Sequence, residues 1–555
     1  MKVSNALIMK CCCIRLHKAM LIVVMAALYS CVAGVADSEK QVFYYNENSG
    51  IASLDPAFAK NQSVIWAVHQ IYNTLVETDS ALNIVPSLAY RWDVSDDRMT
   101  YTFHLRRDVY FHDNRLFANG RGRRMVASDI AYSLGRIIDP RVASSGAWIF
   151  NDRINKDDAF RALDDSTFQL KLKKPFTPVL GLLSMQYCSI VPKEVVEYYG
   201  KDFRKNPCGT GPFQLAAWYE GQALVLHKNA RYFQYDEYGN RLPYLDAVKI
   251  SFYDSKATEF LMFRQGQLDF VNDIDASFRD EVLTKAGRLR KEWEGRIVLS
   301  KHPYLNTEYL GILVDTSNAL MKKNPLRFKY VRQAINYGFD RRKMILYLRN
   351  SIGIPATSGF IPAGLPSFDS GKVEGFEYDP QKAADLLKQA GFPGGKGLGE
   401  IKLLTIPIYG DLAAYIAGQL QEIGIPIKVE VIQKSLLLEQ TATSRAAFFR
   451  GSWIADYPEA ENYLSVFYGK NPAPPNYTRY DNPSFNRLYE QALQTNNDSL
   501  RIILYQQMDN MIIDDAPVVP LWYDEVIRLV NPRISGFQPN ALNLLELRRV
   551  RKRNG

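Results

Sequence analysis

The chain has 555 residues, of which 47% are hydrophobic and 23% are charged, values typical of a folded globular protein that exclude disorder as the default. At roughly 100–200 residues per domain, this length predicts about three or four domains. The formal net charge of +9 falls by four when the basic residues before residue 37 are left out. The mild excess that remains has no nucleic-acid-reading element beside it, which argues against nucleic-acid binding.

Residues 1–36 have the layout of a secretory signal. Basic residues precede an apolar run from 19 to 28, which is too short for an ordinary membrane span, and small residues follow. The sequence Leu-Tyr-Ser-Cys at 28–31 resembles a lipobox, in which Cys31 is lipidated and becomes the new N-terminus. Ordinary cleavage after residue 36 is the alternative. Either interpretation predicts an exported protein, in the periplasm or on the outer face of a cell membrane, and the first adds a lipid anchor.

Only two cysteines, Cys188 and Cys208, follow this signal. In an exported protein, such a pair predicts a disulfide, and the chain-entropy model gives a loop of this length about 3 kcal/mol of stabilisation. Two buried free thiols are the alternative. The spacing does not match a zinc site, and the whole chain has six histidines, so neither a metal nor a cofactor is expected.

The first half of the chain contains short strands and two helices. Hydrophobic residues at every second position, as at Tyr101, Phe103 and Leu105, predict half-buried strands, whereas helical spacing predicts helices. A turn is expected at 53–56, and a loop rich in Tyr, Asn and Gly at 231–243. The strands are expected at 41–45, 100–105, 168–172 and 223–227, and the helices at 63–76 and 127–138.

The pattern changes near residue 302, after which helices have clear start and stop signals. Asp379 and Pro380 are typical of an N-cap and a first helical turn, and Gly391 ends that helix. A helix, a glycine and an apolar strand in succession indicate an α/β layer arrangement. Further helices are expected at 412–423, 484–493 and 500–513, and strands at 427–431, 518–523 and 526–530.

The longest recognisable motif, VPSLAYRWDVSDDRMTYTFHLRRDVYFHD, runs from Val85 to Asp113. It resembles the corresponding segment of bacterial solute-binding family 5, the dipeptide- and oligopeptide-binding proteins of ABC importers. Asn114, in place of the usual glycine, and Asp315, in place of a common asparagine, depart from the family pattern and concern loop shape. Shorter motifs keep the family's order: LDP at 54–56, GTGPF at 209–213, LPYLD at 242–246, VRQAIN at 331–336 and DYP at 456–458.

The resemblance implies an α/β protein with the two-lobed fold of type II periplasmic binding proteins, in the large three-domain variety with an inserted extra domain and a hinge between the lobes. The implied boundaries are 37–75, 190–301 and 516–547 for a discontinuous lobe I, 76–189 for the inserted domain, 302–515 for lobe II, and 548–555 for a basic tail. We expect this tail, and the arginine-rich loop at 121–124, to be solvated.

The resemblance also implies a function: capture of di- to oligopeptides between the lobes and delivery to the permease subunits of an ABC importer. We expect a monomer that binds no nucleic acid. A non-peptide solute, such as a metal chelate, haem, an oligosaccharide or an opine, is an alternative within the family, and a surface receptor lipoprotein without transport is another. Because the sequence has no nucleophile motif, phosphate loop or dinucleotide-type glycine motif, catalysis is not expected.

The segment at 450–458, RGSWIADYP, contains the candidate ligand site. In family members that bind peptides, the aspartate before Tyr-Pro pairs with the α-ammonium of the peptide, a role that falls on Asp456. Carbonyl groups of Ser452 and Ile454 are the implied further acceptors. A buried ammonium needs such partners because its desolvation is costly. Without the resemblance, an Asp-Tyr-Pro turn is better explained as a surface cap.

Four further residues complete the candidate ligand site. Trp453 is the implied wall of a side-chain pocket, and Tyr457 belongs to the same turn as the aspartate. Arg450 matches an arginine that receives the carboxylate of short peptides in oligopeptide binders, for which a guanidinium offers a two-pronged donor; an ordinary salt bridge is the alternative. Trp148 lies near the position where the family presents backbone to the peptide, and core packing is its alternative use.

Overall fold

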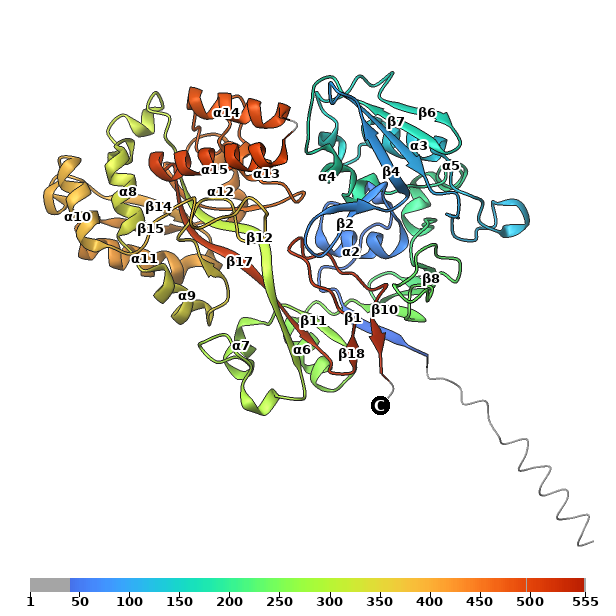
Figure 1. Ribbon diagram of the computed structural model, residues 1–555. Helices are drawn as coiled ribbons and strands as arrows, with labels where there is room; N and C mark the ends of the chain where they lie inside the picture. The colour runs from blue at the N-terminus through green and yellow to red at the C-terminus, as the bar shows by residue number, and fades with distance from the viewer. Residues whose placement is uncertain (1–39, 496, 554–555) are drawn as a thin grey trace, which may run out of the picture.

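The computed structural model describes residues 40–495 and 497–553, so the predicted signal at 1–36 and the lipidation site Cys31 lie outside the described residues. The chain forms two lobes, and the long strands β12 (Val298–Ile312) and β17 (Val518–Val530) run from one lobe into the other (Figure 1). In the part of the chain that the structure describes, no helix is both long enough and apolar enough to cross a membrane.

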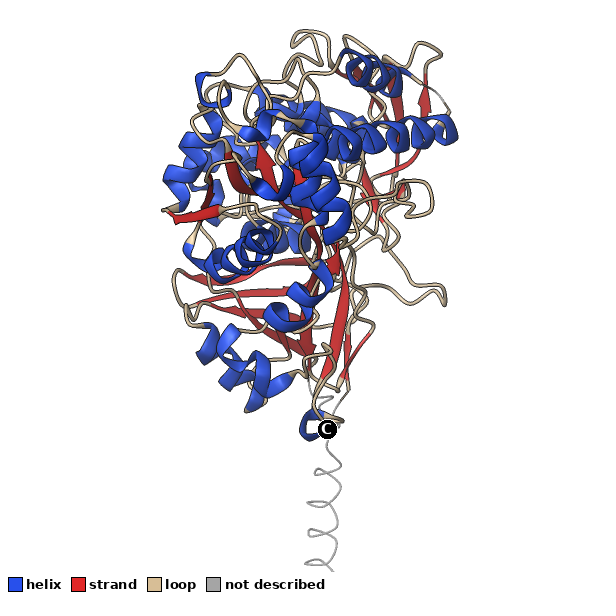
Figure 2. Cartoon of the chain, turned by 90° about the vertical axis from the view of Figure 1, so that its left-hand side faces the viewer, coloured by secondary structure: helices blue, strands red, loops and turns tan. Residues whose placement is uncertain are grey.

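A mixed sheet extends through both lobes, and its strands are the red arrows at the centre of Figure 2. Within the described residues its order is β15 (Ile427–Val431), β14 (Ile401–Thr405), β16 (Phe448–Ile454), β12, β17, β11 (Phe270–Asn272), β1 (Val42–Asn46), β10 (Ala247–Ser251), β9 (Ala223–Lys228) and β8 (Phe213–Tyr219), with β13 (Ile354–Pro355) paired to β17. β14 and β15 are parallel, as are β1 and β10, whereas β12 and β17 are antiparallel.

The two lobes are connected through the β12–β17 pair. These strands are antiparallel partners over most of their length, but their register is irregular between Pro303 and Thr307. A proline has no N–H to donate to the ladder, so pairing is interrupted there and the strand bends. The lobe boundary implied by the sequence, at residue 302, lies beside this irregularity, which is where the hinge is expected.

Lobe I packs helices and loops on the end of the sheet formed by β11, β1, β10, β9 and β8. The motif GTGPF lies against the last turn of its first helix: a Cβ atom on Gly209 would stand 2.2 Å from the carbonyl oxygen of Ile71. Only glycine allows this approach. The other elements are α2 (Gln62–Ile71), α5 (Lys193–Tyr199), α6 (Lys256–Arg264), α7 (Ala276–Val282), β18 (Ile534–Ser535), β19 (Arg551–Lys552) and the 3₁₀ turns η1 (Pro56–Phe58), η5 (Gly200–Lys205) and η6 (Lys291–Trp293).

The inserted region has a four-stranded antiparallel sheet and shares its core with lobe I. Phe103 of the inserted region and Leu226 on β9 of lobe I belong to one continuous hydrophobic core, so the two form a single body. The sheet order is β4 (Ala89–Val94), β5 (Thr100–Leu105), β7 (Thr167–Lys171) and β6 (Phe160–Asp164), covered by α3 (Ala127–Ile138). The remaining elements are β2 (Val76–Thr78), β3 (Ile84–Pro86), α4 (Val179–Leu183), η2 (Ala118–Gly120), η3 (Ala147–Ile149) and η4 (Gln186–Cys188).

Lobe II has helices on both faces of its half of the sheet. One hydrophobic core joins the strands to α8 (Lys329–Tyr337), α9 (Arg341–Arg349), α10 (Pro380–Gln389) and α11 (Gly410–Glu422). A second core joins them to α13 (Glu461–Leu464), α14 (Pro483–Gln494) and α15 (Asp498–Asp515). Also present are α12 (Lys434–Ala442), η7 (Ala319–Met321), η8 (Pro325–Arg327), η9 (Pro393–Gly395), η10 (Pro407–Tyr409) and η11 (Ser465–Phe467). This layering is the predicted α/β arrangement.

Several predicted elements are confirmed. The strand at 100–105 and the helix at 127–138 coincide with β5 and α3. The cap on α10 is also confirmed, since the Asp379 carboxylate accepts from the backbone N–H of Lys382 at 2.9 Å. The helix predicted at 63–76 is too long: α2 ends at Ile71, the next residue is extended, and the chain enters β2 at residue 76.

The two strands predicted at 518–523 and 526–530 form one strand, β17. The prediction of an interruption between them was wrong, because the two acidic residues at that point remain in the strand. Asp524 instead pairs with Arg349 at 3.1 Å, and Glu525 pairs with Lys301 at 2.9 Å, so both side chains stay within the strand with their charges matched.

The basic C-terminal tail is solvated only in part: Arg551 and Arg553 are exposed, as predicted, but other basic residues of the tail are held by carboxylates. Arg548 is largely buried and pairs with Glu77 at 3.0 Å and with Glu546 at 2.7 Å. Lys552, on β19, pairs with the buried carboxylate of Asp269 at 2.8 Å. Carboxylates of lobe I and of the inserted region therefore neutralise these basic residues and tie the C-terminal segment to both.

The arginine-rich loop is solvated only in part. Arg121 and Arg124 are exposed, but Arg123 is half-buried. Its guanidinium pairs with Asp129 at 2.7 Å and with Glu194 at 2.5 Å. The predicted solvated loop is therefore wrong at its central arginine, which is used to join α3 to α5.

The predicted disulfide is also wrong, because Cys188 and Cys208 are free and buried thiols. Each thiol has an acceptor of its own: Cys188 donates to the carbonyl of Leu182 at 3.4 Å, and Cys208 donates to the carbonyl of His112 at 3.6 Å. Burial raises the pKa of both thiols, which makes them unreactive. The two thiols are therefore satisfied separately, as in the alternative interpretation of the sequence.

Candidate functional site

A cavity of ≈ 460 Å³ lies between the lobes and has the size of a small-ligand pocket. Lobe I and the inserted region form one wall, and lobe II contributes residues of β12 and of the turn after β16. The lining segments are 59–62, Ile65, Trp66, Thr78, Trp148, 184–187 and 542–544 on the first wall, and Tyr304 and 454–458 on the second. A ligand held here contacts both lobes.

Asp456 stands where β16 has ended and the chain turns along the cavity. The side chain of Asn462, on α13, holds this turn from behind. Its oxygen accepts from the indole N–H of Trp453 at 2.9 Å and from the backbone N–H of Asp456 at 3.4 Å, and its nitrogen lies 3.5 Å from the Asp456 carboxylate. The aspartate is thereby positioned by its backbone, while its carboxylate reaches the cavity.

The Asp456 carboxylate is exposed to the cavity but crowded by protein atoms. Among the described residues it has no ion-pair partner. Desolvation raises the pKa of Asp456 above its ordinary value; the amide of Asn462 acts in the opposite direction, and the carboxylate of Glu461 adds to the increase. A raised pKa means that the ionised form lacks stabilising partners. A cation placed in the cavity would supply one.

Tyr457 anchors the turn to the opposite body. Its ring is buried in the core of lobe I and the inserted region, next to Gly181 on α4. Its hydroxyl donates to the buried carboxylate of Glu461, which also accepts from the hydroxyl of Tyr489. Tyr457 therefore contributes a wall to the cavity, but its polar group is already in use.

Residues 452–454 are divided between the two faces of β16, because successive side chains of a strand point in opposite directions. Ile454 lines the cavity. Ser452 lies on the same face of the strand, opposite Glu308 on β12, and outside the described lining of the cavity. Trp453 packs into the second core of lobe II. Trp453 therefore does not line this cavity, and its indole N–H donates to Asn462 instead.

Arg450 also lies outside the described lining of the cavity. It pairs with Glu308 at 2.5 Å, and the two side chains are 12% and 5% exposed. The guanidinium carbon lies 4.0 Å from the centre of the Tyr409 ring. This arrangement is the salt bridge that the sequence left open as the alternative to a carboxylate receptor.

Trp148 does line the cavity, and it does so together with aromatic residues that sequence reasoning missed. These are Trp66 on α2, Tyr187 on η4 and Tyr304 on β12. Their separation in the sequence hides their common position, and no local motif marks them. Tyr304 had one indirect signal, since it follows the predicted lobe boundary at 302.

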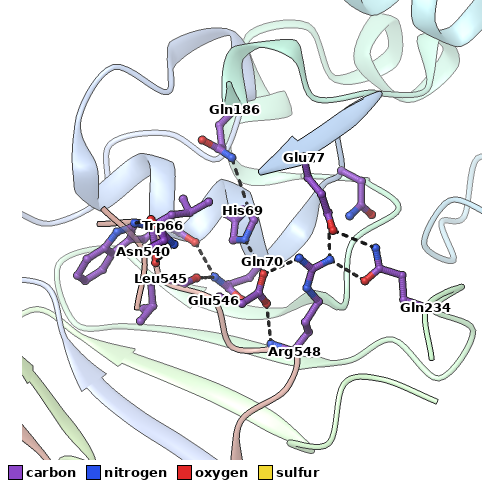
Figure 3. Close-up of polar contacts among 12 residues, drawn as sticks. Trp66, His69, Gln70, Glu77, Gln186, Gln234, Asn540, Leu545, Glu546 and Arg548 are labelled. Carbon is purple, nitrogen blue, oxygen red and sulfur yellow. Dashed lines mark hydrogen bonds and ion pairs between the residues drawn. The ribbon is translucent and has the colours of Figure 1, made fainter. Parts of the chain in front are cut away.

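A chain of polar contacts leads from the cavity wall into lobe I (Figure 3). The amide nitrogen of Gln186 lies 3.4 Å from Nδ1 of His69, and Nε2 of His69 lies 3.2 Å from the carboxylate of Glu546. Although burial acts to raise it, Arg548 and His69 hold the pKa of Glu546 well below its usual range. The C-terminal segment therefore supports the wall of the cavity through matched charges.

The site has the character of a binding pocket. Among the described residues, no group of three or more His, Cys, Asp or Glu side chains is arranged to hold a metal ion. Among the described residues, the cavity offers one carboxylate, one exposed lysine, several aromatic faces and neutral amides. Such a set binds a small cation that carries an apolar or peptide-like body.

Comparisons with known proteins agree over nearly the whole chain. The profile of the bacterial extracellular solute-binding proteins, family 5 Middle, matches residues 83–475. The dipeptide-binding protein of Escherichia coli (strain K12) is 25% identical over 554 residues, which cover 95% of this chain and 98% of that protein. Heme-binding protein A of Haemophilus influenzae is 26% identical over 525 residues, which cover 90% of each.

A solved structure shows the same agreement in three dimensions. The ABC transporter-associated periplasmic binding protein DppA from Helicobacter pylori, in complex with the peptide STSA, is 25% identical and superposes with a TM-score of 0.72. The match covers 94% of this chain and 100% of that one. The fold described above is thus that of a known group of two-lobed binding proteins.

Proposed function

The chain belongs to the bacterial extracellular solute-binding proteins of family 5, and on this premise we propose that it captures peptides between its lobes and delivers them to an ABC importer. It acts by binding alone and catalyses no reaction. The predicted export signal supports a position outside the cytoplasm, and lipid anchoring through Cys31 is part of the proposal. The peptide-binding relatives support the choice of ligand.

The observation that carries this proposal is the exposed, incompletely partnered carboxylate of Asp456 in a cavity between two lobes. A peptide α-ammonium has three N–H donors and one positive charge, and leaving it buried without partners is costly. Asp456 supplies the opposite charge, and we assign a further acceptor to the carbonyl group of Ile454, which lines the cavity. The carbonyl group of Ser452, outside the described lining, stays a prediction from the resemblance. Every peptide with a free N-terminus carries this group, so recognition does not depend on side-chain identity.

The aromatic walls support a ligand that carries side chains. Trp66, Trp148 and Tyr187 face the cavity from one body, and Tyr304 faces it from the other. Large flat rings contact side chains of many shapes with little loss of conformational entropy. We propose that these rings cover the ligand's side chains while the charge at its N-terminus fixes its orientation.

Delivery to a transporter requires that the ligand-bound protein differ in conformation from the empty protein. Because the cavity walls come from both lobes, a bound peptide stabilises the closed arrangement by contacting the two at once. The membrane permease subunits are the proposed partner that recognises this arrangement.

The test is identification of the retained ligand by mass spectrometry after purification, followed by calorimetry. Pools of random-sequence peptides of two to five residues are titrated with free and with acetylated N-termini. We expect retained peptides, and binding of the free pool only. Retention of haem, an oligosaccharide or a metal chelate would refute the peptide assignment, and equal binding of the acetylated pool would refute the role of Asp456.

A further inference from the structure

We propose that this protein recognises its ligand through one charged end only, because Glu308 keeps Arg450 neutralised and leaves the described cavity wall of lobe II without a receptor for a carboxylate. The inference rests on the proposed function and specifies its substrate class: peptides that enter the cavity by their ammonium end and whose carboxyl end stays in water. Glu308 is then a specificity-determining residue.

The Glu308–Arg450 pair is a short, buried contact between two neighbouring strands. The residues stand on the neighbouring strands β12 and β16, and the charged atoms are 2.5 Å apart in a nearly dry environment. Glu308 also accepts from the hydroxyl of Tyr409 at 3.2 Å and from the amide of Asn306 at 3.1 Å. Arg450 stacks on the same Tyr409 ring. Glu308 therefore has three partners within the protein, whereas Arg450 has the Glu308 carboxylate and the Tyr409 ring, and its buried Nε has no hydrogen-bond partner among the described residues.

The geometry of the contact, rather than the surroundings, favours the ionised pair. Burial raises the pKa of Glu308, and Arg450 beside it acts in the opposite direction. A guanidinium stays charged at any physiological pH, and the short contact has the geometry of a charge-assisted bond. The positive charge of Arg450 is thus cancelled where it stands.

The next cation on this side of lobe II is neutralised in the same way. Arg349, at the end of α9, pairs with Asp524 on β17 at 3.1 Å and stacks on the ring of Trp522 at 4.3 Å. Asn306 joins the two pairs, since its amide donates to Asp524 at 3.3 Å as well as to Glu308. The group of two arginines and two carboxylates has no net charge to offer a ligand.

The cavity itself provides little for an anion. Among the described residues that line it, Asp456 and Lys60 are the charged ones. Lys60 is exposed, and an exposed lysine gains little from an ion pair in water. Recruiting Arg450 instead would strand Glu308 in a buried place, which would weaken binding by ~100-fold or more. The carboxylate of a bound peptide is therefore most stable at the mouth of the cavity, where water solvates it.

The experiment compares random-sequence tripeptide pools in three forms: unmodified, N-acetylated and C-amidated. Binding is measured by calorimetry, and retained species by mass spectrometry. We expect C-amidation to change the dissociation constant by less than ~3-fold and N-acetylation to raise it by ~30-fold or more. A loss of ~10-fold or more on C-amidation would overturn the inference alone. Insensitivity to N-acetylation, or binding of no pool, would overturn the proposed function and the inference with it.

The variant Glu308→Gln tests the assigned residue directly. Glutamine keeps the shape and the acceptor oxygen but frees the charge of Arg450, so the unmodified pool should gain ~10-fold or more over the amidated pool. The double variant Glu308→Gln, Arg450→Met is the matched control and should lose this gain. If the folded single variant still treats both pools alike, Glu308 is not the determinant. If that variant does not unfold cooperatively, the result with C-amidated peptides on the unaltered protein decides.

Discussion

Replacing Asp456 by asparagine should separate ligand binding from folding. The substitution keeps the size of the side chain and removes its charge. In the free protein, desolvation raises the pKa of Asp456, with Asn462 opposing and Glu461 adding to this increase, so the ionised form is poorly stabilised there. Removing that charge should leave the free energy of unfolding unchanged or slightly higher. Removing it from the complex should weaken binding strongly.

The size of the binding loss follows from the exposed position of the carboxylate in a confined cavity. For unit charges about 3 Å apart and an effective dielectric constant of about 20, Coulomb's law gives about 5.5 kcal/mol. Desolvation of the ligand's ammonium offsets part of this attraction, and truncation of one member of a buried charge pair costs about 2–5 kcal/mol. We therefore expect the Asp456→Asn variant to bind peptides about 30-fold to several thousand-fold more weakly.

Calorimetry at neutral pH with peptides eluted from the unaltered protein measures this loss, and thermal unfolding of the ligand-free variant measures its stability. We expect the dissociation constant to rise while the melting temperature of the ligand-free variant stays the same or rises slightly. A variant that binds within about threefold of the original would refute the pairing with the ammonium. A variant that binds weakly because it melts several degrees lower would refute the claim that the carboxylate is unneeded for folding.

Four further outcomes are expected. Because the proposed binding needs ionised Asp456, whose pKa is raised, and a protonated amine on the ligand, affinity should fall as the pH drops through the pKa of Asp456 and again above about pH 8. Calorimetry across pH should show that the acid limb disappears in Asp456→Asn. Asn462→Ala removes an acceptor shared by an indole and a backbone N–H, and should lower the free energy of unfolding by about 1–3 kcal/mol and weaken binding, as judged by urea denaturation and calorimetry. Arg548→Met leaves two buried glutamates without their partner and should cost about 3–5 kcal/mol in the same denaturation assay, whereas an unchanged midpoint would mean that the tail is solvated after all. Since Cys188 and Cys208 are free, a thiol reductant should leave the melting temperature unchanged, where a disulfide would forfeit about 3 kcal/mol.

Local patterns were sufficient to predict the parts of the fold that local patterns control. β5 follows from the alternation of Tyr101, Phe103 and Leu105, and α10 follows from its cap at Asp379. The end of α2 was missed because the helical spacing of hydrophobic residues continues past Ile71, where the helix ends, and no glycine or proline marks that point. Where tertiary packing decides an element's length, propensity is only a weak guide.

Asp456 was predicted through the family resemblance, whose motif is contiguous, since strand, turn and proline lie within one short segment; the structure places its side chain in the lining of the cavity. The state of Arg450 could not be predicted, since Glu308 is distant in the chain and reaches it only through the pairing of β12 with β16. The same limit applies to Cys188 and Cys208, whose spacing in the sequence says nothing about the direction of their side chains. Long-range pairing is the information that a single sequence lacks.

β12 links the expected hinge to the candidate site. Tyr304, in the cavity wall, lies within the irregular stretch of β12, and Glu308, in the neutralised group of charges, follows directly after it. A rotation of the lobes about that stretch would move Tyr304 and Asp456 relative to Trp66 and Trp148, which belong to the other body. A ligand can favour closure only by as much as it binds the closed state better than the open one. On the proposed function, the contacts that matter for capture are therefore those that span the two walls, with the Asp456 charge fixing the ligand on one wall while the aromatic rings of the other close over it.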